Sequence, residues 1–85
     1  MIDKELKKET EKWLKRIEEK MKNIQLIDKS KQEILVNIEA YISDCRHFLE
    51  KNDLIRAFEA IIYAWGIIET LERIELVKYQ NKPHQ

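Results

Sequence analysis

The feature that most constrains the fold is a long apolar stretch, Leu54 to Ile68, in which only Arg56 and Glu59 carry charge. A helix with so few charges is too apolar for a protein surface and has to be covered. At 100° per residue, seven of its large side chains fall within an arc of about 140°. The predicted core residues are Leu54, Ile55, Phe58, Ile61, Ile62, Trp65 and Ile68.

A second strip of the same helix carries small side chains, Ala57, Ala60 and Ala64, followed by Leu71. Small side chains let a neighbouring helix come close, so we expect a partner helix along this strip. The one glycine of the sequence, Gly66, lies inside the helix. Glycine costs about 1 kcal/mol there relative to alanine. We interpret Gly66 as a second sign of close helix approach.

Two further stretches have helical periodicity. From residue 3 to about residue 24, apolar residues recur every three or four positions between lysines and glutamates, with Thr10 in one apolar slot. Ser30 followed by Glu33 is a capping-box pattern, which predicts that a second helix begins near residue 31. This helix carries its own apolar stripe, and Cys45 lies at apolar spacing within it. A lone cysteine excludes an intramolecular disulfide, and we expect it to fill space in the core.

The link between the second and third helices is short. Asn52 tolerates the left-handed conformation that ends many helices, and Asp53 is a favoured N-cap. The second helix is therefore expected to end near residue 51 and the third to run from about 54 to 77. A connection of this length makes the two helices antiparallel neighbours.

These patterns predict an all-α fold, an antiparallel three-helix bundle that forms a single domain over residues 1–85, with a frayed tail at 80–85. The alternative is a two-helix hairpin with a detached first helix. That arrangement would expose Trp13, Ile17 and Met21 unless a partner covered them.

Charge and hydropathy exclude several classes of partner. The sequence has 16 basic and 16 acidic residues, which argues against binding by bulk electrostatics and so against direct nucleic-acid binding. The longest uncharged run, Ala60 to Ile68, is far shorter than the roughly 20 residues that span a bilayer. The first residues lack the apolar core and the small-residue cleavage site of a signal peptide, so none is expected. We expect a cytoplasmic protein with no membrane partner.

The polar residues beside the predicted core form no recognisable catalytic set. Asp44 and His47 lie three residues apart on one helix, but a zinc site needs three or four ligands. Asp44 is expected to border the core, partly buried, near Tyr63. The chain has no nucleophile triad and no glycine-rich phosphate loop, so we expect no enzyme, no metal and no cofactor. A small-molecule site around Asp44, His47, Arg56 and Tyr63 is the alternative.

Some apolar residues fall outside the predicted core. Val36, Ile67 and Ile74 occupy positions where a monomer would normally place lysine or glutamate. Contiguous exposed apolar residues mark partner surfaces. We therefore predict a protein-interaction edge on the third helix, formed by Tyr63, Ile67, Thr70 and Ile74, with Val36 as a further candidate. A protein partner is expected, and a homodimer stays open.

The stretch from Tyr41 to Gly66 resembles an archaeal family catalogued as domain of unknown function 357. The residues that carry the resemblance are Asp44, Phe48, Asp53, Ala57, Tyr63, Ala64 and Gly66. Asn52 replaces the usual turn glycine, and Glu69 stands where an aspartate is common. The resemblance implies an archaeal protein and a three-helix bundle, without an established activity. Relatives joined to larger enzymes imply an adaptor. The size is also similar to that of a small accessory subunit of the crenarchaeal family B DNA polymerase.

Overall fold

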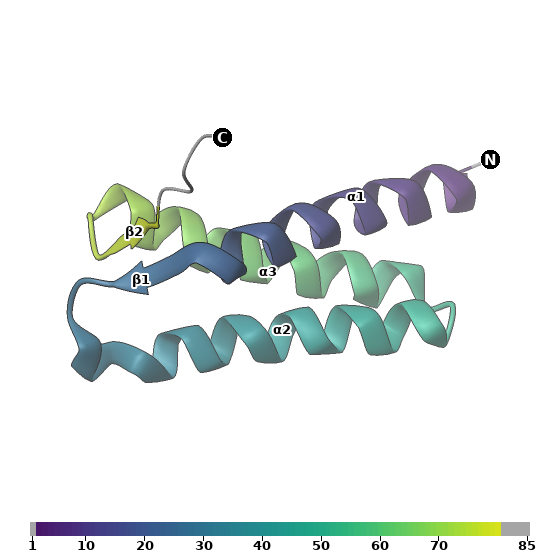
Figure 1. The fold of residues 1–85 in the computed structure, drawn as a ribbon. Coiled ribbons are helices and arrows are strands. Elements are labelled where there is room, and N and C mark those ends of the chain that lie inside the picture. Colours follow the sequence, from purple (N-terminus) through teal and green to yellow (C-terminus); the bar gives the residue numbers. More distant parts are fainter. Residues whose placement is uncertain (1, 81–85) are drawn as a thin grey trace.

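The computed structural model describes residues 2–80, which form three long helices packed together with a small two-stranded sheet (Figure 1). Helices α1 and α3 run in the same direction and α2 runs against both, so the predicted three-helix bundle is confirmed. The elements are α1 (Ile2–Asn23), β1 (Ile24–Leu26), the short 3-10 helix η1 (Lys29–Lys31), α2 (Gln32–Glu50), α3 (Leu54–Arg73) and β2 (Val77–Tyr79).

The turn between α2 and α3 has the predicted chemistry. Asn52 adopts a left-handed conformation with φ of 57°. Its amide donates to the carbonyl of Leu49 at 3.0 Å, and the amide of Asp53 donates to the carbonyl of Phe48 at 2.8 Å. The Asp53 carboxylate then accepts from the amide of Arg56 at 3.3 Å, which caps α3. The predicted roles of Asn52 and Asp53 are thereby confirmed.

A second left-handed residue, Glu75, ends α3. Its φ is 59°, its amide donates to the carbonyl of Glu72 at 3.2 Å, and the amide of Leu76 donates to the carbonyl of Leu71 at 2.9 Å. This is the bonding pattern of a helix C-terminus closed by a left-handed residue. The helix stops at Arg73, four residues before the predicted end at 77, because the chain reverses at Glu75.

The reversal lets the chain form a sheet that the sequence pattern did not reveal. Strand β2 pairs antiparallel with β1, so that Leu26 lies opposite Val77. The amide of Ile27 extends the ladder by donating to the carbonyl of Leu76 at 2.9 Å. Leu26 and Val77 are both buried. The sheet therefore fastens the α1–α2 link to the segment after α3. Of the predicted tail at 80–85, residues 81–85 lie outside the described part of the chain.

The start of α2 differs from the expected capping box. Asp28, not Ser30, is the capping residue: its carboxylate accepts from the amide of Ser30 at 3.0 Å and from its hydroxyl at 2.7 Å. These hydrogen bonds from Ser30 hold the pKa of the Asp28 carboxyl below its usual value. They cap η1, and α2 begins at Gln32 without a side-chain cap. The predicted capping box between Ser30 and Glu33 is therefore wrong.

The core lies along the alanine strip of α3. The buried residues of α3 are Ala57, Ala60, Ile61, Ala64, Ile68 and Leu71. They pack with Ile17 of α1 and with Ile38, Ile42 and Cys45 of α2. Cys45 is fully buried in this core, which confirms the expectation for it, and burial raises the pKa of its thiol to about 11.

The predicted core face of α3 is correspondingly rotated. Ile55 is 67% exposed and Ile62 is 45% exposed, so both were wrongly assigned to the core. Leu54, Phe58 and Trp65 are only half-buried. The physical reason is that small alanines allow α2 to approach closely, which turns the bulky side chains beside them toward the surface.

Two tryptophans join α1 to α3. Their rings meet edge to face, with centroids 5.5 Å apart. The indole NH of Trp65 donates to the backbone carbonyl of Trp13 at 3.0 Å. Nearby, Thr10 is fully buried, and its hydroxyl donates to the carbonyl of Leu6 at 2.8 Å. Since α1 is packed in this way, the alternative with a detached first helix is excluded.

Candidate interaction surface

An apolar groove of about 750 Å³ lies between α2 and α3. Three residues of the predicted interaction edge meet here: Tyr63, Ile67 and Thr70. Tyr63 and Thr70 are exposed, whereas Ile67 is half-buried against the core. The full lining is Ile34, Asn37, Ile62, Tyr63, Gly66, Ile67, Thr70 and Leu71. Helix spacing alone thus brought three of the five predicted contact residues together.

The other two predicted contact residues lie elsewhere. Val36 is 59% exposed on α2 but is absent from the groove lining. Ile74 is also exposed and occupies the C-cap position of α3, beyond the end of the groove. Each is an isolated exposed apolar residue, which is common on protein surfaces.

Gly66 lies in the lining of this groove and in that of a smaller hollow of about 220 Å³ beside Trp13 and Trp65. A methyl group at Gly66 would meet no atom within 4 Å. The interpretation that Gly66 permits close helix approach inside the bundle is therefore wrong. Thr70 sits one turn away, and its hydroxyl donates to the Gly66 carbonyl at 2.8 Å.

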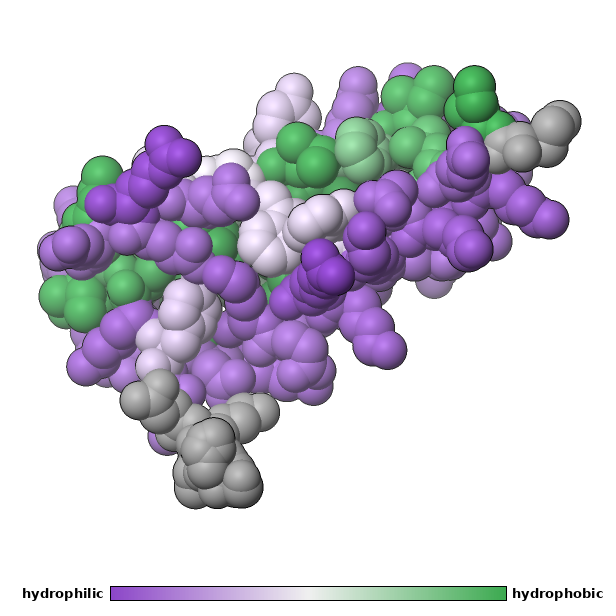
Figure 2. All heavy atoms as spheres, turned by 90° about the horizontal axis from the view of Figure 1, so that it is seen from above, coloured by the Kyte–Doolittle hydropathy of each residue, from purple (hydrophilic) through white to green (hydrophobic). Residues whose placement is uncertain are grey.

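Part of the exposed apolar surface lies at one end of the bundle. Helices α1 and α3 both begin at that end (Figure 1), where Ile2 and Ile55 are strongly exposed. Figure 2 shows one group of hydrophobic residues next to the N-terminal end of the chain and a second at the opposite end of the molecule, with hydrophilic residues over much of the remaining visible face. Sequence reasoning missed Ile55 and Ile62 as surface residues. The alanine strip was the signal that could have placed them outside the core.

The predicted polar residues are partly brought together. Asp44, Arg56 and Tyr63 line one hollow of about 250 Å³ between α2 and α3. Asp44 is exposed, not partly buried as expected. The Arg56 guanidinium lies 6.0 Å from the ring centroid of Phe48. His47 is exposed and outside this hollow, with its ring 5.5 Å from that of Phe48.

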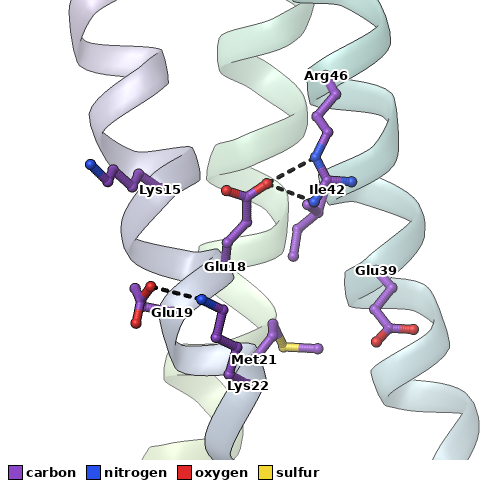
Figure 3. Close-up of a pocket in the computed structure, with 8 residues that line it drawn as sticks. All are labelled: Lys15, Glu18, Glu19, Met21, Lys22, Glu39, Ile42 and Arg46. Carbon is purple, nitrogen blue, oxygen red and sulfur yellow. Dashed lines mark hydrogen bonds and ion pairs between the residues drawn. The ribbon is translucent and has the colours of Figure 1, made fainter.

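A fourth hollow, of about 550 Å³, lies between α1 and α2 (Figure 3). Glu18 of α1 and Arg46 of α2 point toward each other across it, and two guanidinium nitrogens lie 2.6 and 2.8 Å from one carboxylate oxygen. Met21 and Ile42 supply its apolar lining. The pair is largely exposed, and exposed ion pairs contribute at most about 1 kcal/mol. The ion pair between Glu18 and Arg46 therefore helps to align α1 with α2.

Sequence reasoning missed one polar cluster at the far end of the bundle. The Glu72 carboxylate accepts from Lys20 Nζ and from the Tyr79 hydroxyl, both at 2.5 Å. Burial alone would raise the pKa of Glu72, but these two hydrogen bonds outweigh it and lower the pKa. Burial and the Glu72 carboxylate both raise the pKa of Tyr79. The cluster ties β2 to α1 and α3, and no sequence signal marks it because Lys20 lies 52 residues from Glu72 in the chain.

Two searches of the described residues, 2–80, give negative findings. No group of three histidine, cysteine, aspartate or glutamate side chains there is arranged to hold a metal ion. Within the same residues, every helix is too short or too polar to cross a membrane.

Comparison with known proteins agrees with this architecture. A family model described as "Protein of unknown function (DUF357)" matches residues 8–77. The chain belongs to the DUF357 family. The crystal structure of DUF357 protein AF1782 from Archaeoglobus fulgidus is similar with a TM-score of 0.84 and 45% identity, over 94% of this chain and 100% of that one. A search of curated proteins gives no match. DUF357 membership and the archaeal relative confirm the resemblance noted in the sequence.

Proposed function

We propose that this DUF357 chain is a non-catalytic protein-interaction module, an accessory subunit that stabilises a larger archaeal complex. The observation that carries the proposal is the exposed apolar face of α3 with its adjoining groove. A contiguous exposed apolar surface favours burial against another protein. The groove is suited to an elongated partner, because an amphipathic helix can bind with its apolar face between two helices.

The lining argues for a protein and against a reaction centre. Asn37, Tyr63 and Thr70 are the polar-tipped side chains of the groove, and none of its lining residues is charged. Small-molecule sites combine an apolar pocket with precisely placed polar groups, and catalytic sites bring titratable groups together. The replicative family B DNA polymerase is the specific partner we propose, on the resemblance in size to its small accessory subunit.

The test is co-elution of the purified chain with the family B polymerase of its source organism. Ile62→Glu places a charge in the groove at an exposed position and is expected to abolish co-elution while the helical circular dichroism is retained. Val36→Glu is the matched control, because Val36 is an exposed apolar residue outside the groove. Equal binding by wild type and Ile62→Glu would contradict the proposal. Binding of another protein through the same face supports the module and excludes the polymerase.

A second candidate is a small-molecule site around Asp44 and Tyr63. The observation that favours it is the meeting of a carboxylate, a guanidinium and a phenol at one hollow. Its volume of about 250 Å³ is below the roughly 300 to 1,000 Å³ of ordinary ligand pockets. Thermal-shift screening of wild type against Asp44→Asn separates the two proposals, because only a ligand held here would stabilise the wild type alone.

A further inference from the structure

Gly66 makes no close packing contact with the described residues, 2–80. Glycine inside a helix destabilises it, because glycine loses more conformational freedom on folding than alanine does. Such a residue is useful where another backbone approaches closely, but a methyl group at Gly66 would meet no atom within 4 Å. The space beside Gly66 is therefore open to the backbone of another chain.

Gly66 lies at the middle of an exposed stripe along α3. At 100° per residue, five other exposed residues fall within about 40° of it on either side. We call this set the Gly66 stripe: Ile55, Glu59, Ile62, Gly66, Thr70 and Arg73. Hollows lie on both sides of the stripe, and Ile62 lines three of them. A helix laid along the stripe would have space on both flanks for its side chains.

The charges of the stripe are arranged symmetrically about the glycine. Glu59 and Arg73 lie seven residues before and after Gly66, which is about 10.5 Å along the helix axis in each direction. Neither forms an ion pair within residues 2–80. When two copies of α3 cross antiparallel at Gly66, Glu59 of each copy lies opposite Arg73 of the other. A parallel pair would instead oppose like charges.

A second pair of residues has the same relation. Tyr63 and Glu69 lie three residues before and after Gly66, about 60° to either side of it, so the antiparallel crossing brings a phenol and a carboxylate to the same level on the two flanks of the contact. Both side chains are exposed, and neither has a hydrogen-bonding partner in the described part of the chain. Two other stripe residues, Ile62 and Thr70, lie four residues before and after Gly66 and so come to a common level on either side of the crossing.

We propose that a second copy of this chain packs antiparallel on α3, with a two-fold axis passing beside Gly66. The inference rests on the proposed function, since it names a second copy of the chain as a partner that binds the exposed face of α3. A two-fold interface uses the same patch on both copies and closes on itself, so it ends in a dimer and not in a filament.

Sedimentation equilibrium tests the register through a charge exchange. The wild type is expected to sediment at twice the 10.3 kDa mass of one chain. Glu59→Arg and Arg73→Glu each create two repulsive contacts in the dimer and are each expected to weaken association about tenfold or more. The double variant restores both pairs with reversed charge and is expected to recover the wild-type association. Val36→Glu, outside the stripe, should leave association unchanged.

Gly66→Ala provides a second readout that a folding defect cannot imitate. The substitution is expected to raise the melting temperature, because alanine favours a helix and has open space around it. It should nevertheless weaken the dimer by separating the two backbones. A wild type that is monomeric up to about 1 mM would overturn the proposal. So would a double variant that fails to recover association. If a monomeric wild type still bound a partner that Ile62→Glu lost, self-association would fall while the proposed function stood.

Discussion

Adjacent isoleucines on α3 allow the orientation of this helix to be tested in one experiment. Ile61 is fully buried, whereas Ile62 is 45% exposed and borders the groove. Replacing a buried isoleucine with alanine removes its transfer free energy and leaves a cavity, at a cost of about 2 to 5 kcal/mol. Ile62→Ala leaves no closed cavity. Because the Ile62 side chain is only about half buried in the wild type, the substitution removes less buried apolar surface and is expected to cost about 1 kcal/mol or less.

These free energies convert into well-separated melting temperatures. For a domain of this size, 1 kcal/mol shifts the midpoint by roughly 4 to 8 °C. A loss of about 3 kcal/mol in Ile61→Ala therefore lowers the melting temperature by roughly 12 to 24 °C, and Ile62→Ala lowers it by at most a third of that. Thermal and urea unfolding, followed by circular dichroism at a concentration where wild type and variants are all monomeric, supply the measurement. Equal losses at the two positions, or a larger loss at Ile62, would refute the placement of the core along the alanine strip.

Four further outcomes follow from the same contacts. Glu75→Gly should raise the free energy of unfolding by about 1 kcal/mol, because glycine adopts the left-handed conformation without strain, and a calorimetric scan in which it matches Glu75→Ala would contradict this. The raised pKa of Tyr79 stabilises the fold below about pH 10, the unfolded value, and this contribution is lost as pH rises further. Tyr79→Phe should therefore be less stable than the wild type at neutral pH and should lose less stability than the wild type as pH rises in an unfolding series. If stability fell equally with pH in both proteins, the hydrogen bond between Tyr79 and Glu72 would be excluded. The lowered pKa of Glu72 acts at the acid end of the pH range. It stabilises the fold above about pH 4.3, the unfolded pKa, and this stabilisation is lost as pH falls through the lower pKa of the folded state. Glu72→Gln should therefore lose less stability than the wild type when the same series is extended to acid pH. Iodoacetamide at pH 8 should label Cys45 only as fast as the chain opens, since the thiol is buried and its pKa is raised to about 11; labelling at the rate of a free thiol peptide would show that the core is open.

The fold could be predicted largely because its signals are local. Apolar spacing identified three helices, and the pair Asn52 and Asp53 located the turn between two of them. The sheet could not be found in this way, because strands of three residues carry too short an alternation and the partners are about fifty residues apart. The end of α3 was missed because glutamate is an uncommon residue for a left-handed position, so Glu75 gives no stop signal.

The candidate surface could be predicted only in part, for a different reason. Isoleucine is more hydrophobic than alanine, so a prediction from hydropathy places Ile55 and Ile62 in the core and leaves Ala57 and Ala60 at the edge of the core. In the folded chain the close approach of α2 reverses that order. Tyr63, Ile67 and Thr70 line one groove, because neighbours on one helix face stay neighbours whatever the helix packs against.

The central claim is that the outer face of α3 serves association and is not part of the fold. Amide chemical shifts of the isotope-labelled chain, recorded from dilute solution to about 1 mM, test it residue by residue. We expect concentration-dependent shifts along the Gly66 stripe, with the signals of Val36 and of the charged face of α1 unchanged. Shifts confined to α1, or a stripe whose signals do not move with concentration or on addition of the polymerase, would contradict it.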